Sequence, residues 1–352
     1  MKIHLLSGFL GSGKTTAIQQ ASLSLMQEGI KTGVIANDQG IKLVDNHFFE
    51  SLQIPSRQVI NGCFCCNYND LAAGILSLIE TNQTEIIFAE SVGSCTDIVA
   101  TVLKPLLLSY AGAQVTVSVF ADARLLEMML SNKKHAFAET VRYIYLKQLE
   151  EAGIIVVNKI DLIGNRVLSG IKEYMQQHYP GKVLLYQNSL DAGSIQEWLK
   201  TIDSAGIAGN LSSLTIDYDV YAAGEASLAW LDQELEIYSP VNNARQHAVD
   251  LVNNIYSRIN VGQYAIGHFK CFIDGAVKIS FVSNSEPPAS IKKQFSGSAS
   301  LLINIRVQAS PEEIQQLLTE AIHNEEAKSG CRIIVNSLSA FQPGYPKPTH
   351  RM

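Results

Sequence analysis

The stretch that decides the fold of this chain is Gly8-Phe9-Leu10-Gly11-Ser12-Gly13-Lys14-Thr15. It follows an apolar run at residues 2–6 and precedes an amphipathic segment that begins at residue 15. Gly, four residues, Gly, Lys and then Ser or Thr, between a strand and a helix, is the pattern of a phosphate-binding loop. A glycine-rich turn before a helix is the alternative, and the elements predicted on either side argue against it.

Side chains of this loop have separate expected tasks on a nucleotide. Backbone N–H groups wrap the phosphates at the start of the helix, Lys14 reaches the β- and γ-phosphates, and the Thr15 hydroxyl ligates Mg²⁺. We therefore predict hydrolysis of a nucleotide, with Lys14 as a catalytic residue. The nucleotide-binding residues predicted here are Gly8, Gly11, Ser12, Gly13, Lys14, Thr15 and Thr16.

Outward from the loop, the first two hundred residues alternate β-branched runs with segments of helical periodicity. This alternation indicates βαβ units, and so an α/β P-loop NTPase fold with a mostly parallel sheet. Predicted strands lie at residues 2–6, 32–36, 86–89, 115–120, 154–157 and 183–186. Predicted helices lie at residues 15–27, 67–80, 97–109 and 134–150.

A second, smaller α+β domain is predicted after a change of composition near residue 204. Its expected order is β-α-β-β-β-α-β, with a hairpin turned at Asp274-Gly275 and a helix that starts at Ser310-Pro311. We predict a P-loop domain at residues 1–205, a linker at 206–213, the second domain at 214–338 and a Pro-rich segment at 339–352.

Composition excludes several classes of protein. The 352 residues are 47% hydrophobic and carry a formal net charge of -6 without a dense Lys/Arg run, so we expect no nucleic-acid partner. No stretch reaches the ~20 apolar residues of a spanning helix, so we expect no membrane association and a cytoplasmic location. Three of the six cysteines crowd into one loop, which favours thiol or metal chemistry over a disulfide scaffold.

Carboxylates at the ends of two predicted strands are candidates for the Mg²⁺ and water positions. Glu90 ends an apolar run, so we predict it to be the acidic Mg²⁺ residue, and Gly93 to meet the γ-phosphate with its N–H. Residues 91–97 would then form a loop that responds to the nucleotide. Asp38 is expected either to act in the first switch on Mg²⁺ or water, or to cap a turn.

Asn158-Lys159-Ile160-Asp161 follows another predicted strand, where a guanine base would lie. A carboxylate at Asp161 can accept hydrogen bonds from both N1–H and the exocyclic amine of guanine, which adenine cannot supply. The position on the sheet favours guanine recognition over a helix-capping role for Asp161. Asn188 and Ser189, after the next strand, are predicted to complete the base pocket.

Gly62-Cys63-Phe64-Cys65-Cys66 is the second unusual loop. Thiolates bind Zn²⁺ or Cu(I) strongly, and three in four positions can supply most of a tetrahedral site. A single cysteine would be attributed to burial, but three in so short a loop favour a metal. The fourth ligand stays open, and the candidates are Cys95, His47, Asp38 or water.

With these motifs in place, the first ~205 residues resemble the CobW family of metal-handling GTPases, related to UreG and HypB. The second domain resembles that family's C-terminal domain through residues 266–270 and Asp274-Gly275. The resemblance implies slow GTP hydrolysis coupled to delivery of zinc or cobalt, with the metal bound by Cys63, Cys65 and Cys66. The Pro-rich segment is outside the resemblance.

The motifs are compatible with three hypotheses for the function of the protein. The leading hypothesis is a GTP- and Mg²⁺-dependent metallochaperone for zinc (or cobalt). Its partner would be a client metalloprotein or a cofactor-biosynthesis enzyme, with cobalamin biosynthesis suggested by the family's name, and a homodimer is a further assembly to test. The alternatives are a P-loop kinase of a small molecule and a nucleotide-gated metal sensor without significant turnover.

Overall fold

The computed structural model describes residues 1–40, 49–130, 137–204, 211–292 and 294–352. The chain divides into two compact units. The first unit comprises Met1–Gln39, Leu52–Gly224 and Tyr345–Met352, and the second comprises Gly40–Ser51 and Glu225–Gly344. The predicted linker at 206–213 falls largely on residues 205–210, which lie outside the described residues.

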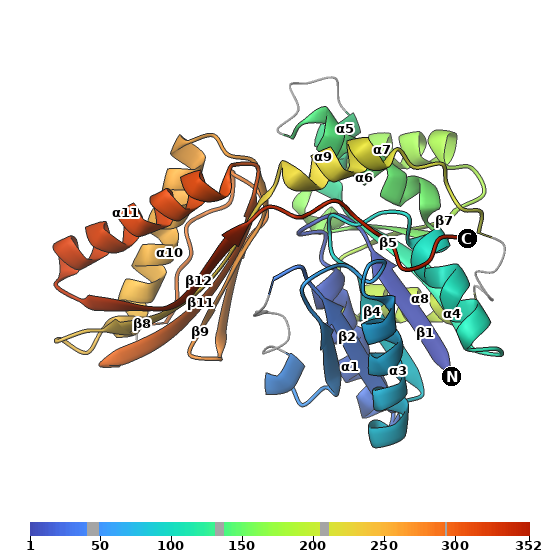
Figure 1. The fold of residues 1–352 in the computed structure, drawn as a ribbon, viewed down its shortest axis with the longest axis horizontal. Coiled ribbons are helices and arrows are strands. Elements are labelled where there is room, and N and C mark those ends of the chain that lie inside the picture. Colours follow the sequence, from blue (N-terminus) through green and yellow to red (C-terminus); the bar gives the residue numbers. More distant parts are fainter. Residues whose placement is uncertain (41–48, 131–136, 205–210, 293) are drawn as a thin grey trace. The chain divides into compact units, whose positions relative to one another are not determined.

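The first unit is built on a seven-stranded sheet of order β3-β2-β4-β1-β5-β6-β7, in which all neighbouring strands are parallel (Figure 1). Its strands are β1 Lys2–Ser7, β2 Thr32–Asn37, β3 Ser56–Val59, β4 Ile86–Glu90, β5 Gln114–Asp122, β6 Ile154–Asn158 and β7 Val183–Gln187. Every residue of β2 and of β6 is buried, so both faces of the sheet are covered. This confirms the predicted fold class.

Most helices of the first unit lie between these strands as crossovers, and the last two follow the final strand. They are α1 Lys14–Gln27, α3 Tyr68–Asn82, the π-helix η1 Val99–Leu103, α4 Lys104–Ser109, α5 Ala123–Leu130, α6 Glu139–Glu151, the 3₁₀ turn η2 Ile160–Leu162, α7 Asn165–His178, α8 Ala192–Ser204 and α9 Tyr218–Ala226. The helix predicted at 97–109 is present over residues 98–109, but its first half is the π-helix η1 and only its second half is α4; Pro105, which has no N–H for a regular α-helical hydrogen bond, lies at the start of α4. No helix among the described residues is long and apolar enough to cross a membrane.

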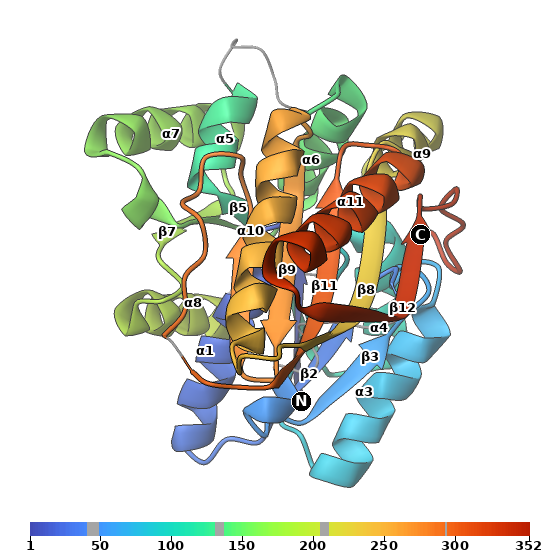
Figure 2. The same cartoon turned by 90° about the vertical axis from the view of Figure 1, so that its left-hand side faces the viewer.

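The second unit is an antiparallel sheet of order β10-β9-β11-β8-β12 with two long helices on one face, as Figure 2 shows. Its elements are β8 Ala229–Tyr238, α10 Ala244–Val261, β9 Ile266–Ile273, β10 Val277–Phe281, β11 Ser298–Val307, α11 Pro311–Ser329 and β12 Arg332–Phe341. Ser310 caps α11 in a capping box with Glu313. The order matches the β-α-β-β-β-α-β prediction. The strand β12 ends at Phe341, three residues beyond residue 338, the predicted end of the second domain.

Candidate nucleotide and metal site

The phosphate loop joins the end of β1 to the start of α1, and its glycines have backbone angles that few other residues adopt. Gly8, Gly11 and Gly13 have φ of 125°, 71° and 94°. A Cβ at Gly8 would lie 2.1 Å from the Phe120 carbonyl oxygen, and a Cβ at Gly13 would lie 2.3 Å from Asn158 Nδ2. Only glycine therefore fits at these two positions of the cradle.

Lys14, Thr15 and Glu90 meet at the predicted phosphate and Mg²⁺ positions. The Thr15 hydroxyl donates a hydrogen bond to Glu90 Oε1 at 3.0 Å, and Lys14 Nζ lies 3.9 Å from the same oxygen. Lys14 also donates to the Gly8 carbonyl at 2.8 Å, so its ammonium group lies inside the loop. A hydroxyl and a carboxylate in contact form the oxygen-donor set that Mg²⁺ prefers, so the residues present fit that ion.

The loop that follows Glu90 packs tightly against the phosphate loop. A Cβ at Gly93 would lie 2.8 Å from Leu10 N and 2.9 Å from Leu10 Cα, so the two backbones are in close contact. Gln148 of α6 holds the loop by donating to the Gly93 and Cys95 carbonyls, at 3.1 and 2.8 Å. Gln148 could not be predicted from the sequence, because nothing local distinguishes one buried Gln on a helix.

The predicted base-binding residues are joined to the phosphate loop by hydrogen bonds. Asn158 Nδ2 donates to Ser12 O at 2.9 Å, and Lys159 Nζ donates to Gly11 O at 2.6 Å. Asn158 Oδ1 accepts from the backbone N–H and the hydroxyl of Ser189, at 3.0 and 2.9 Å. The two motifs, far apart in sequence, form one site at the carboxyl ends of β1 and β6.

Asp161 and Asn188 take different positions beside this network. Asp161 is exposed on η2, where its carboxylate is open to a ligand. Asn188 Oδ1 accepts from Leu190 N at 2.9 Å and shapes the turn after β7. Thr16 is half-buried in the first turn of α1, and Ser12 is buried.

Asp122, at the end of β5, belongs to the site and was missed. Its Oδ2 lies 2.9 Å from Lys159 Nζ and 3.1 Å from an Arg124 nitrogen. Burial alone would raise the pKa of Asp122, but Lys159 and Arg124 more than offset it, and the pKa is lowered. Asp122 is thus an anion that fixes Lys159. The signal was a carboxylate two residues past the predicted strand end, where β5 in fact continues.

The cysteine loop is held at the end of β2 by one amide side chain. Asn37 Nδ2 donates to the Val59 and Gly62 carbonyls at 2.9 and 2.7 Å, and Asn37 Oδ1 accepts from Phe64 N at 2.8 Å. Asp38, the next residue, donates its N–H to Val59 O at 3.1 Å. The cysteine loop, which follows β3, is therefore hydrogen-bonded to Asn37, the residue directly before Asp38.

The three sulfur atoms of the loop form one cluster, within 4.8 Å of one another. Cys63 and Cys65 are joined as a disulfide, and Cys66 Sγ lies 3.5 Å from Cys63 Sγ and 3.7 Å from Cys65 Sγ. Reduction of that pair is required before all three sulfurs can bind a metal as thiolates. Of the candidate fourth ligands, Cys95 is buried in the loop after Glu90, and His47 lies outside the described residues.

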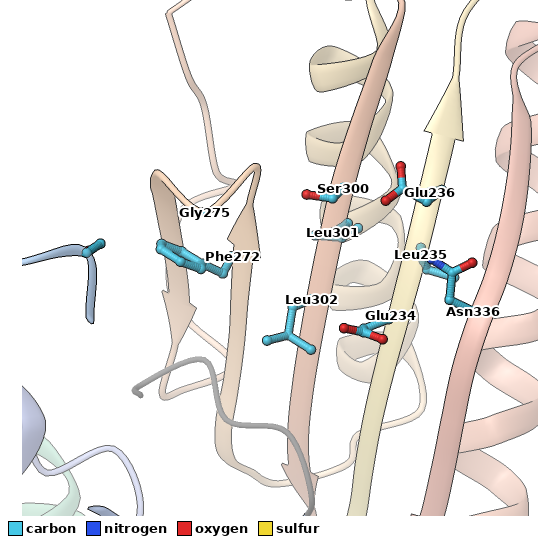
Figure 3. Close-up of a pocket in the computed structure, with 10 residues that line it drawn as sticks. Glu234, Leu235, Glu236, Phe272, Gly275, Ser300, Leu301, Leu302 and Asn336 are labelled. Carbon is cyan, nitrogen blue, oxygen red and sulfur yellow. The ribbon is translucent and has the colours of Figure 1, made fainter. Parts of the chain in front are cut away.

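The second unit contains a buried group of polar side chains and a surface hollow. His247, Glu325 and Cys331 form a buried group, with His247 Nδ1 3.0 Å from Glu325 Oε1. A separate hollow of about 390 Å³ lies on the sheet, with Glu234, Phe272 and Leu302 among its lining residues (Figure 3). Its lining includes none of the residues predicted for the nucleotide or for the three thiols, and those predicted residues lie in the first unit.

A glycine-rich cradle between β1 and α1, with its Lys and Thr beside a strand-end carboxylate in a parallel sheet, defines a P-loop NTPase. A sequence model of the CobW/HypB/UreG nucleotide-binding domain matches residues 2–185. That match covers more than half of the chain, and the chain belongs to this family.

Comparison with known proteins gives partial matches. The zinc chaperone YjiA of Escherichia coli is 34% identical over 96 residues, covering 27% of this chain and 30% of YjiA. The zinc chaperone YeiR of the same organism is 26% identical over 188 residues, covering 53% of this chain and 54% of YeiR. The matched stretches thus span about half or less of these relatives.

A solved structure, HypB from Helicobacter pylori in complex with nickel, covers 61% of this chain and 92% of its own length. The identity is 16% and the TM-score is 0.44.

Proposed function

We propose that this chain is a GTP-hydrolysing metallochaperone that couples the state of its nucleotide to delivery of zinc or cobalt to a client protein. The observation that carries the proposal is the register of β2 against β4. Ala36 lies opposite Glu90 in that register, and the next residue, Asn37, holds the cysteine loop. The predicted Mg²⁺ carboxylate therefore ends β4, and the end of the neighbouring strand β2 is hydrogen-bonded to the predicted metal-binding loop.

Roles on the nucleotide follow from the described contacts. Lys14 would neutralise the β- and γ-phosphates, while Thr15 and Glu90 would hold Mg²⁺, directly or through water. When bound, Mg²⁺ would polarise the phosphates and neutralise charge that develops in hydrolysis. Asp161 would select guanine, and Asn158 and Lys159 would fix the base pocket against the phosphate loop.

Coupling would pass through the residues that leave β2. A movement of Asp38 would displace the adjacent Asn37, whose side chain donates to the Val59 and Gly62 carbonyls and accepts from Phe64 N beside the sulfurs. Slow intrinsic turnover is expected, because no arginine finger or catalytic Gln stands out from the sequence. Membership of the CobW/HypB/UreG family and the partial matches to two zinc chaperones support this proposal.

The experiment compares metal affinity in two nucleotide states. Zn²⁺ and Co²⁺ affinities of the reduced protein are measured with GDP and with a non-hydrolysable GTP analogue, beside GTP turnover with and without metal. The variant carries Ser at positions 63, 65 and 66, and the matched control is Cys271→Ala, which removes a buried thiol of β9. Affinity that ignores the nucleotide, and survives loss of the three thiols, would refute the coupling. A phosphorylated metabolite formed from ATP would favour the kinase instead.

A further inference from the structure

The C-terminal tail, Tyr345–Met352, belongs to the first unit and pairs with the cysteine loop. Thr349 donates its N–H to the Cys65 carbonyl and its hydroxyl to the Cys66 carbonyl, both at 2.8 Å. The N–H of Lys347 donates to Cys66 Sγ at 3.3 Å. The tail therefore contacts both the backbone of the loop and one of its sulfur atoms.

The next residues of the tail continue onto neighbouring elements. The His350 ring meets the edge of the Tyr68 ring, with centroids 4.8 Å apart, at the start of α3. Met352 N donates to Ala100 O in η1 at 3.0 Å, and the end of the chain lies close to α4 (Figure 1). These contacts cover the side of the cysteine loop that leads into α3.

Arg351 links the tail to the loop that follows Glu90. Its Nε lies 2.8 Å from Asp97 Oδ2, and its guanidinium also donates to Leu214 O at 2.8 Å. Asp97 is 1% exposed and has a φ of 67°, a conformation that needs support from its surroundings. Burial raises the pKa of Asp97, and the hydrogen bonds from Tyr218 and Arg351 oppose that rise. Arg351 supplies the opposite charge that this carboxylate requires.

From these contacts we propose that the C-terminal tail is a working part of the metal site: it straps the cysteine loop to the Asp97 loop and controls how firmly Cys66 holds metal. The Lys347 N–H would stabilise the Cys66 thiolate, as donors around a metal ligand do. Arg351 would transmit changes in the Glu90–Asp97 loop to the same strap.

This inference rests on the proposed function for its metal but not for its contacts. Lys347→Pro removes the N–H that reaches Cys66 Sγ, and Lys347→Ala, at an exposed side chain, keeps it. Truncation after Gly344 removes the whole strap. A thermal unfolding curve for each variant shows whether the first unit remains folded.

Two readouts on reduced protein separate the tail from the metal. The first is Zn²⁺ affinity by chelator competition, which we expect to fall about fivefold in Lys347→Pro and about 10- to 100-fold on truncation. The second is the rate of Cys66 alkylation at one fixed pH, mapped by mass spectrometry in the absence of metal. This rate should rise in Lys347→Pro and in the truncated chain, because the contact between the tail and Cys66 Sγ is lost, and stay unchanged in Lys347→Ala.

The outcomes distinguish the two proposals. If the full chain binds metal through its thiols, but truncation and Lys347→Pro leave both the affinity and the alkylation rate unchanged, the role of the tail is refuted and the metallochaperone stands. If the full chain binds no metal while the alkylation rate rises as expected, the strap stands and the metal function is refuted. Equal effects of Lys347→Pro and Lys347→Ala would also overturn the role of the N–H.

Discussion

Glu151, the last residue of α6, should make the stability of the first unit depend on pH. Its side chain is 2% exposed, and its two oxygens accept from the Thr96 hydroxyl at 3.1 Å and from Val99 N at 3.3 Å. It thereby holds the region between the Glu90–Asp97 loop and η1. The pKa of Glu151 is raised to about 8: burial is the main cause, nearby Asp97 adds to it, and these hydrogen bonds oppose it.

The sign follows from proton counts. Between the unfolded pKa of 4.5 and the folded pKa of about 8, the folded chain keeps a proton that the unfolded chain has released. The stabilisation is therefore complete below pH 4.5 and declines as the pH rises, until it is lost above about pH 8. At about 1.4 kcal/mol per pKa unit, the upper limit of this decline is about 5 kcal/mol. In Glu151→Gln the decline should be absent, with a constant offset of about 1 kcal/mol for one weakened hydrogen bond.

The assay is urea unfolding, monitored by Trp198 fluorescence, at intervals from pH 5 to pH 9. The chain has two tryptophans, and Trp198 belongs to the first unit. Trp230→Phe in both proteins removes the signal of the second unit. The difference in unfolding free energy between wild type and Glu151→Gln should be small near pH 5, reverse as the pH rises, and level off near pH 8 at several kcal/mol in favour of Glu151→Gln. Parallel curves over this range would refute a protonated Glu151.

Three further substitutions test the site. Gly93→Ala should weaken nucleotide affinity about tenfold or more, since its Cβ would meet the Leu10 backbone at 2.8 Å. The control is Gly170→Ala, whose Cβ would meet nothing within 4 Å. It should leave nucleotide affinity unchanged and stabilise α7 by up to about 1 kcal/mol. Asn158→Ala should reduce GTP binding, measured by fluorescent-nucleotide titration, and lower stability by about 2 to 3 kcal/mol, because Ser12 O and Ser189 lose their partner; unchanged binding would separate this network from the base. Asn37→Ala should lower Zn²⁺ affinity of the reduced protein while GTP affinity persists, because Phe64 N loses its acceptor; equal loss of both affinities would show general unfolding instead.

Local sequence signals predicted most elements that have strong periodicity or caps. All six predicted strands of the first sheet are present, and each ends one or more residues later than predicted. The strand β3 was missed, because Ser56-Arg57-Gln58-Val59 is a short polar edge strand that pairs on one side only. The helices α7 and α8 were missed too, although their buried residues recur at helical spacing, as Ile171 and Met175 do in α7.

The phosphate loop was determined by sequence alone, because its chemistry depends on the backbone freedom of glycines and on residues adjacent in the chain. The same holds for the three crowded cysteines and for the order of the second unit. Tertiary structure decided what surrounds them. The contacts across the fold join Asn37 to the cysteine loop, Asp122 to Lys159 and Gln148 to the Gly93 carbonyl. They also join Thr349 to the cysteine loop and Arg351 to Asp97. Such partners leave no periodic or local signal, since a hydrogen bond or ion pair needs only proximity in space.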